Sequence, residues 1–102
     1  MKLKQKQPTE SEITRGIRQY LKLKGIFHWK VWQGLGSTPG VPDIVGICRG
    51  RFVGIEVKTA KGKLSEHQEQ FRDAIVREGG LYILARSTDD VATVFERKEA
   101  QP

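Results

Sequence analysis

Two acidic residues and a lysine lie in stretches of the chain that are otherwise apolar. Asp43 begins one run of β-forming residues, and Glu56 lies within the next run, two positions before Lys58. Side chains two positions apart on a strand point to the same face of its sheet, so Glu56 and Lys58 share a face. A charge in an apolar strand is costly unless it has a partner, so these three residues need a reason to be there.

The spacing of the two runs predicts how these residues meet. If Gly50-Arg51 is a two-residue turn, the runs form a hairpin in which Asp43 lies opposite Lys58. Val45 then lies opposite Glu56. Asp43 and Glu56 become diagonal neighbours, about 7–8 Å apart at the backbone and closer at their carboxylates. The pattern therefore predicts two carboxylates and one ammonium group that converge at the edge of a sheet.

A pair of carboxylates suits a hard divalent cation, Mg²⁺ or Mn²⁺ rather than zinc, and the backbone carbonyl of Val57 could add a ligand. Such a cation lowers the pKa of a bound water and neutralises charge on a scissile phosphate. Lys58 would orient or help to deprotonate that water and would stabilise the developing negative charge. An ordinary hairpin with an Asp43–Lys58 salt bridge, and Glu56 nearby, fits the same spacing.

The elements that position these residues follow from capping and periodicity. Thr9 and Glu12 have the spacing of a capping box that begins a helix, and Gly25 ends it. Ser65 and Gln68 have the same spacing before a second helix, and a short third helix begins near the end of the chain. Strands are predicted over residues 27–32, 43–48, 52–58 and 81–85, with loops at 33–41 and 60–63. The order αβββαβα predicts one α/β domain with a four-stranded mixed sheet, in which the fourth strand runs parallel to the third.

Composition limits the class of protein. The chain has 102 residues and a net charge of +6, which favours a polyanion such as nucleic acid as partner. The single cysteine, Cys48, excludes an internal disulfide, and no apolar run has transmembrane length. We therefore expect a cytoplasmic protein with no membrane contact. We expect a basic arm over residues 1–8, which carries half of the net charge, one domain over residues 9–98 and a tail over residues 99–102.

Five features of the sequence follow one another in a defined order. They are the first helix with Glu12, Gly40-Val41-Pro42-Asp43, Ile55-Glu56-Val57-Lys58, the segment 64–68 that ends in Gln68, and Gly79-Gly80 before the fourth strand. In these features the chain resembles the PD-(D/E)xK nuclease superfamily, and more closely its VRR-NUC (virus-type replication-repair nuclease) domains. The resemblance covers residues 9–95 and implies a restriction-endonuclease-like core. The bare superfamily motif is weak, whereas the ordered set is more specific.

The resemblance implies Mg²⁺- or Mn²⁺-dependent hydrolysis of phosphodiester bonds in DNA. Asp43 and Glu56 match the metal-binding acids of the family, and Lys58 matches its catalytic lysine. Glu12 and Gln68 match the acid of the first helix and the glutamine of the helix that follows the lysine. Stand-alone members, especially those of phages, resemble Holliday-junction resolvases. The resemblance therefore implies a homodimer, encoded by a phage in a bacterial host or by a bacterium, that acts on four-way junction or flap DNA.

A purely structural role would also explain several of these residues. Glu12 and Gln68 both occupy the third position of a capping box, where each would satisfy a backbone N–H. Trp29 and Trp32 differ by three positions, so we expect one in the core and the other against the 33–41 loop or a partner subunit. The roles of Trp32 and Gln33 in the site stay open.

Five basic residues are candidates for contacts with phosphate, although an ordinary solvated surface would account for each of them equally well. They are Lys61, Lys63, Lys30, Arg15 and Arg18. No segment has the pattern of a base-reading helix or finger, so we expect recognition of DNA shape. A non-catalytic nucleic-acid-binding module is the main alternative. A sequence-specific restriction enzyme shares the core but usually needs more chain to read bases.

Overall fold

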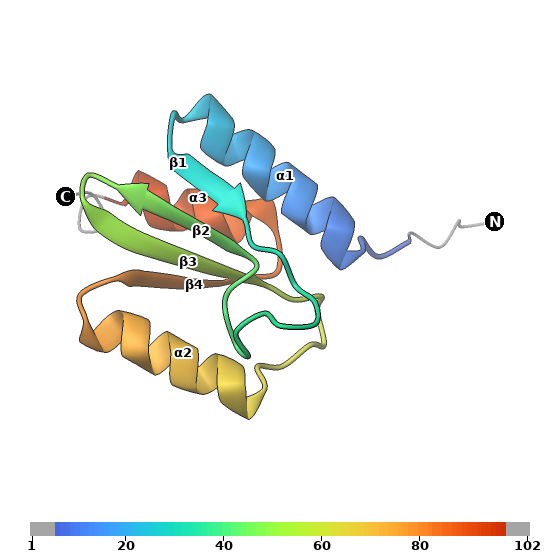
Figure 1. Ribbon diagram of the computed structural model, residues 1–102. Coiled ribbons are helices and arrows are strands. Elements are labelled where there is room, and N and C mark those ends of the chain that lie inside the picture. The colour runs from blue at the N-terminus through green and yellow to red at the C-terminus, as the bar shows by residue number, and fades with distance from the viewer. Residues whose placement is uncertain (1–5, 98–102) are drawn as a thin grey trace.

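The computed structural model describes residues 6–97, which form three helices and four strands (Figure 1). In chain order they are α1 (Glu10–Leu23), β1 (Phe27–Lys30), β2 (Ile44–Cys48), β3 (Arg51–Val57), α2 (Glu66–Arg77), β4 (Leu81–Ala85) and α3 (Thr88–Glu96). The strands form one sheet in the order β1-β2-β3-β4. The first three strands are antiparallel, and β4 runs parallel to β3. These observations confirm the predicted α/β class, the αβββαβα order and the mixed sheet.

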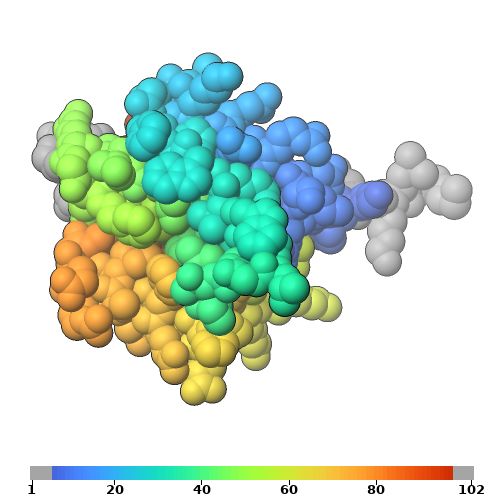
Figure 2. All heavy atoms as spheres, in the orientation of Figure 1, coloured from blue at the N-terminus to red at the C-terminus, as the bar shows by residue number. Residues whose placement is uncertain are grey.

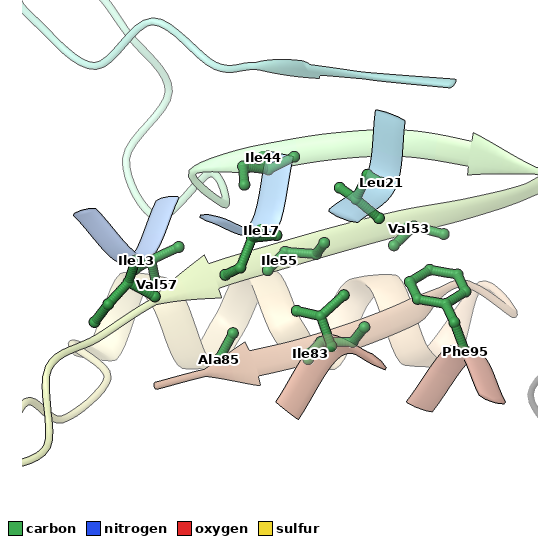
Figure 3. Packing of buried hydrophobic residues seen from close by; sticks show 11 residues of the cluster. Ile13, Ile17, Leu21, Ile44, Val53, Ile55, Val57, Ile83, Ala85 and Phe95 are labelled. Atoms are coloured by element: carbon green, nitrogen blue, oxygen red, sulfur yellow. The ribbon is translucent and has the colours of Figure 1, made fainter. Parts of the chain in front are cut away.

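The sheet lies between two layers of helices. On one face, α1 and α3 pack against the strands and enclose the main hydrophobic core (Figure 3). The other face is covered by α2, which packs against β3 and β4. Apolar residues at helical spacing on α1, such as Ile13, Ile17 and Leu21, meet alternating residues of β3, such as Val53 and Ile55. The two periodicities of the sequence thus produce a single buried layer.

The hairpin between β2 and β3 turns one residue earlier than the sequence suggests. Cys48 pairs with Arg51, so the turn residues are Arg49 and Gly50, with φ angles of 50° and 82°. Two consecutive residues with positive φ form a type I′ turn, whose twist matches that of the flanking strands. The predicted Gly50-Arg51 turn is therefore wrong.

The earlier turn shifts the predicted pairing by two residues. Ile44 pairs with Ile55, and Val45 pairs with Gly54 rather than with Glu56. Continued by one residue, this register places Asp43 opposite Glu56 instead of opposite Lys58. Because a shift of two residues keeps every side chain on its predicted face, the three polar groups still converge.

The first strand ends at Lys30, two residues before its predicted end. The N–H of Val31 donates to the Asp43 carbonyl at 2.8 Å, and Trp32 belongs to the following loop. Trp29 is 45% exposed and Trp32 is 65% exposed, so the prediction that one tryptophan lies in the core is wrong. The face of β1 that carries Trp29 has no helix over it, because α2 packs only on β3 and β4 among the described strands.

The ends of the chain are described only in part. Most of the predicted basic arm (residues 1–8) and the whole predicted tail (99–102) lie outside the described residues, so these domain limits stay predictions. Within residues 6–97, no helix is long and apolar enough to cross a membrane.

Two leucines of α1 offer a matched test of this packing. Leu21 is 1% exposed in the core, whereas Leu23, two residues later, is 87% exposed. We expect Leu21→Ala to lower the free energy of unfolding by about 2–5 kcal/mol, because it leaves a cavity in a packed layer. Leu23→Ala should change it by less than about 0.5 kcal/mol. Urea unfolding of both variants measures the difference, and equal losses would contradict the placement of α1.

Candidate functional site

The candidate site lies where β2 begins and β3 ends, at the end of the sheet where α1 and α2 also begin (Figure 1). Asp43 immediately precedes β2. Its Oδ2 accepts a hydrogen bond of 2.7 Å from the N–H of Val57, the last residue of β3. The backbone pairing of β2 with β3 ends at Ile44 and Ile55, and this hydrogen bond extends it through the side chain of Asp43. It also holds the Asp43 carboxyl beside the neighbouring residue, Glu56.

Glu56 is a buried acid, with 3% of its surface exposed. Its Oε2 accepts a hydrogen bond of 3.1 Å from the amide of Gln68, whereas its Oε1 is buried without a hydrogen-bond partner. Burial is the main cause that raises the pKa of Glu56 to about 8, and the Asp43 carboxyl raises it further. The charge of Lys58 acts in the opposite direction. Without a cation, these surroundings favour the protonated form of Glu56.

These features fit a divalent cation. A cation between the two carboxyl groups would give Glu56 Oε1 the partner that it lacks and would offset the repulsion between Asp43 and Glu56. Within residues 6–97, no group of three or more His, Cys, Asp or Glu side chains could hold a metal ion. A cation at this site would have the carboxylates of Asp43 and Glu56 and the carbonyl of Val57 as its protein ligands. That set suits Mg²⁺, which binds few carboxylates and keeps several waters.

Gln68 combines both of the roles that its position allows. In the first turn of α2, its Oε1 accepts the N–H of the cap residue Ser65 at 2.8 Å, and its Nε2 donates to Glu56. The loop before β2 also contacts this turn. Gly40 has a φ of 83°, and a side chain there would collide with the carbonyl of His67. The start of α2 is thus fixed against Glu56 and against the loop that leads to Asp43.

Glu12 acts as a helix cap in the structure. Its carboxylate accepts the N–H of Thr9 at 2.9 Å, and this backbone hydrogen bond lowers the pKa of Glu12 below its usual value. Among the contacts observed within residues 6–97, none joins Glu12 to Asp43 or Glu56, and its match to the acid of the family's first helix stays a prediction. Glu10 lines a groove together with Asp43, and its charge contributes to the raised pKa of Glu56. Sequence reasoning missed Glu10, although it lies four residues before the buried Thr14 and so shares that face of α1.

Lys58 directly follows β3. Its N–H donates to the carbonyl of Ala85 at 3.0 Å, which ties the end of β3 to the end of β4. The side chain is only partly exposed, and its charge favours the ionised form of Glu56. The predicted trio of Asp43, Glu56 and Lys58 is therefore brought together, in a register that differs from the predicted one.

A groove of about 930 Å³ between α1 and β1 leads to Asp43. Four cationic and two acidic side chains line it: Arg15, Arg18, Lys22 and Lys30, with Glu10 and Asp43. The structure thus brings together three of the five predicted phosphate contacts and adds Lys22. The sequence carried a signal for Lys22, because it lies four residues after Arg18 on the same face of the helix. Lys61 and Lys63 are exposed in the loop after Lys58 and do not line this groove.

The two open residues belong to the loop between β1 and β2. Gln33 donates from Nε2 to the carbonyl of Val41 at 3.3 Å, so it links the two ends of that loop. The Trp32 ring packs over Gly34. Figure 2 shows the teal residues of this loop on the surface between blue α1 and yellow α2. Neither residue touches Asp43 or Glu56 through a contact that we observe.

Comparison with known proteins gives the fold a precedent. The structure is similar to a solved structure described as a VRR_NUC domain, with a TM-score of 0.72 and 22% identity over 87% of this chain and 96% of the other. A second, described as a VRR_NUC domain protein, has a TM-score of 0.73 and 21% identity over 89% and 88%. No family model matches the chain. No curated protein sequence matches it either.

The capping role of Glu12 can be tested by pH. The pKa of Glu12 is lowered in the folded state, so its ionised form stabilises the fold above the unfolded-state pKa of 4.5, and this contribution disappears as the pH falls through the lower folded value. We expect Glu12→Gln to be less stable than the wild type at pH 7 and equally stable at strongly acidic pH. Thermal unfolding across this range measures the gap, and a gap that stays constant with pH would contradict the cap.

Proposed function

We propose that this chain, which has the fold of VRR_NUC domains, is a DNA endonuclease that depends on Mg²⁺ or Mn²⁺. One observation carries the proposal: the partly buried Asp43 carboxyl and the buried Glu56 carboxyl lie side by side, near a lysine and at the end of a basic groove. Phosphate would be repelled by two acids alone. A cation between the acids and the phosphate would remove this repulsion. A protein that only bound DNA would have no need of two acids beside the phosphate.

Each residue of the site then has a task. Asp43 and Glu56 would hold the cation with the Val57 carbonyl, and Gln68 keeps the Glu56 carboxyl oriented by its hydrogen bond. When bound, the cation supplies a water of lowered pKa and neutralises charge on the scissile phosphate. The Lys58 ammonium would orient the attacking water and stabilise the negative charge that develops in the transition state.

The groove along α1 suits the sugar–phosphate backbone of one strand. Arg15, Arg18, Lys22 and Lys30 would contact phosphates, which carry no sequence information. The exposed Lys61 and Lys63 would add contacts on the far side of Lys58. Such contacts recognise the path of a strand rather than its bases, so we propose selectivity for branched DNA such as four-way junctions or flaps.

We also propose that the protein works as a homodimer. Cleavage of two strands needs two sites, and several apolar side chains are exposed on the part of the α2 face of the sheet that this helix leaves uncovered. They include Phe27, Trp29, Ile47 and Phe52, which are 64%, 45%, 45% and 39% exposed. A cytoplasmic setting, in a bacterium or encoded by a phage, remains a prediction from the sequence.

Substitution of the paired residues should abolish cleavage. We expect Glu56→Gln and Asp43→Asn each to lower the rate on a four-way junction with Mg²⁺ by about a thousandfold or more, since each removes a ligand of the cation. Lys58→Met should lower it by about 10²–10³-fold, the cost of losing one group that stabilises charge. Single-turnover assays on junction, flap, duplex and single-stranded DNA measure these rates and the substrate preference.

Glu78→Gln is the matched control, because it replaces a 78% exposed acid at the end of α2 that pairs with its neighbour Arg77. It should cleave at the wild-type rate. A wild-type protein that cuts none of the four substrates with either metal would contradict the nuclease. Thermal unfolding with and without Mg²⁺ then separates the alternatives, because a binding module without a metal site would show no Mg²⁺-linked stabilisation.

The groove predicts how affinity depends on salt. We expect Arg18→Ala to weaken binding to all DNA sequences alike and to reduce the slope of log affinity against log salt by about 1, the value for one lost phosphate contact. Binding is measured with Ca²⁺ in place of Mg²⁺. Arg77→Ala is the control, because Arg77 is 70% exposed on α2 and pairs only with its neighbour Glu78 among the observed ion pairs. Equal slopes for both variants would show that DNA does not follow the groove.

A further inference from the structure

Arg86 holds the loop that follows Lys58. This arginine is the first residue after β4, and its Nη1 lies among three backbone carbonyl oxygens of that loop. The distances are 2.6 Å to Thr59, 3.2 Å to Ala60 and 2.8 Å to Gly62. A charged donor makes stronger hydrogen bonds than a neutral one, so this single side chain can set the shape of the whole turn.

Arg86 is itself anchored by the last helix. Its backbone N–H donates to Oδ2 of Asp90 at 2.8 Å, and Asp90 lies in the first turn of α3, where its own N–H donates to the cap residue Ser87. Arg86 is partly buried, which limits the positions that its side chain can take. The backbone of Arg86 is therefore fixed by α3, and its guanidinium is held by the carbonyl groups of the loop.

The loop in turn restricts the Lys58 side chain. Gly62 closes the turn with an N–H···O bond of 3.1 Å to Thr59. A Cβ placed on Gly62 would lie 3.2 Å from Cδ of Lys58 and 3.3 Å from its Cβ, so the Gly62 backbone packs along the lysine stem. A lysine on a loose turn would sample several rotamers, whereas this packing leaves fewer of them.

We propose that Arg86 is a positioning residue that keeps the Lys58 ammonium directed at the Asp43–Glu56 pair by fixing the 59–62 loop. This inference rests on the proposed nuclease function, since it assigns Arg86 a role through the lysine of that site. Sequence reasoning did not single out Arg86, which directly follows the predicted fourth strand. Its role comes from contacts that join residues 24 to 27 positions apart in the chain.

The test compares Arg86→Met, which has no donor, with Arg86→Lys, whose ammonium can bond the same carbonyls. We expect Arg86→Met to lower the single-turnover rate by about tenfold or more, because a displacement of ~1 Å in a catalytic group can cost about 10²-fold. DNA affinity in Ca²⁺ should change by less than about threefold, since Lys61 and Lys63 stay exposed beside the strand. Arg86→Lys should recover a substantial part of the rate, and Arg77→Met should retain all of it.

Two further measurements separate positioning from mere stability. Amide hydrogen exchange at Gly62 should speed up in Arg86→Met while exchange in the β2–β3 core stays unchanged. In a Lys58→Met background, Arg86→Met should cost almost nothing more, because the group that it positions is gone. An unchanged Gly62 exchange rate, or a full additional loss of activity without Lys58, would overturn the proposal.

Failure of the nuclease function gives a different pattern. If the wild type cleaves no DNA, the proposed function fails. Gly62 exchange and the NMR signals of the Lys58 ε-methylene group still test whether Arg86 fixes the 59–62 loop and, through it, the Lys58 side chain. Arg86→Met should then shift the Lys58 signals and Arg77→Met should not. Identical Lys58 signals in both variants would refute the positioning role of Arg86, whether or not the protein cleaves DNA.

Discussion

The close approach of two carboxyl groups is the constraint on which the rest of this structure depends. Asp43 and Glu56 lie next to each other at the end of the sheet, and Glu56 is almost fully buried. Burial and the neighbouring carboxylate both oppose ionisation of Glu56. Two ionised carboxylates side by side are therefore unfavourable, and the pair needs a proton or a cation to persist. A protein selected for stability alone would place an apolar residue here, as it does at Val53, Ile55 and Val57 of the same strand.

The surrounding elements supply the contacts that keep this pair in place. The Val57 N–H holds Asp43, the Gln68 amide holds Glu56, and the Lys58 charge favours ionisation. These three groups come from the end of β3 and the start of α2, which the chain separates by only a short loop. The antiparallel hairpin brings Asp43 to the same place from the other strand. The site is thus assembled by the β2–β3–α2 unit, and α1 contributes the groove that leads to it.

Much of this arrangement follows from local rules in the sequence. Capping boxes at Thr9 and Ser65 predict the starts of two helices, and the structure shows both. The common face of Asp43, Glu56 and Lys58 is also predictable, because the period of a strand is two and does not depend on the register. The exact partners are not predictable from spacing alone, since they depend on which residues adopt positive φ in the turn. Arg49 takes one of those positions although it is not a glycine.

Other features depend on tertiary contacts that no local pattern encodes. The sequence points to Glu12 as the acid of the first helix. In the structure its carboxylate caps that helix, whereas Glu10 is the acid that lines the groove. The core position predicted for one tryptophan failed because helix α2 covers only half of the sheet.

The distribution of charge gives the last link between fold and function. A net charge of +6 is compatible with many proteins that bind nucleic acid. Here four cations line one groove, and that groove ends at an acid rather than at another cation. In the proposed function, a phosphate that follows the cations would arrive beside Asp43 and Glu56, where a bound divalent ion would offset the repulsion between phosphate and carboxylates. In the proposed nuclease, the same geometry would join binding to cutting, because the groove would bring the DNA backbone to the two acids that would hold the cation.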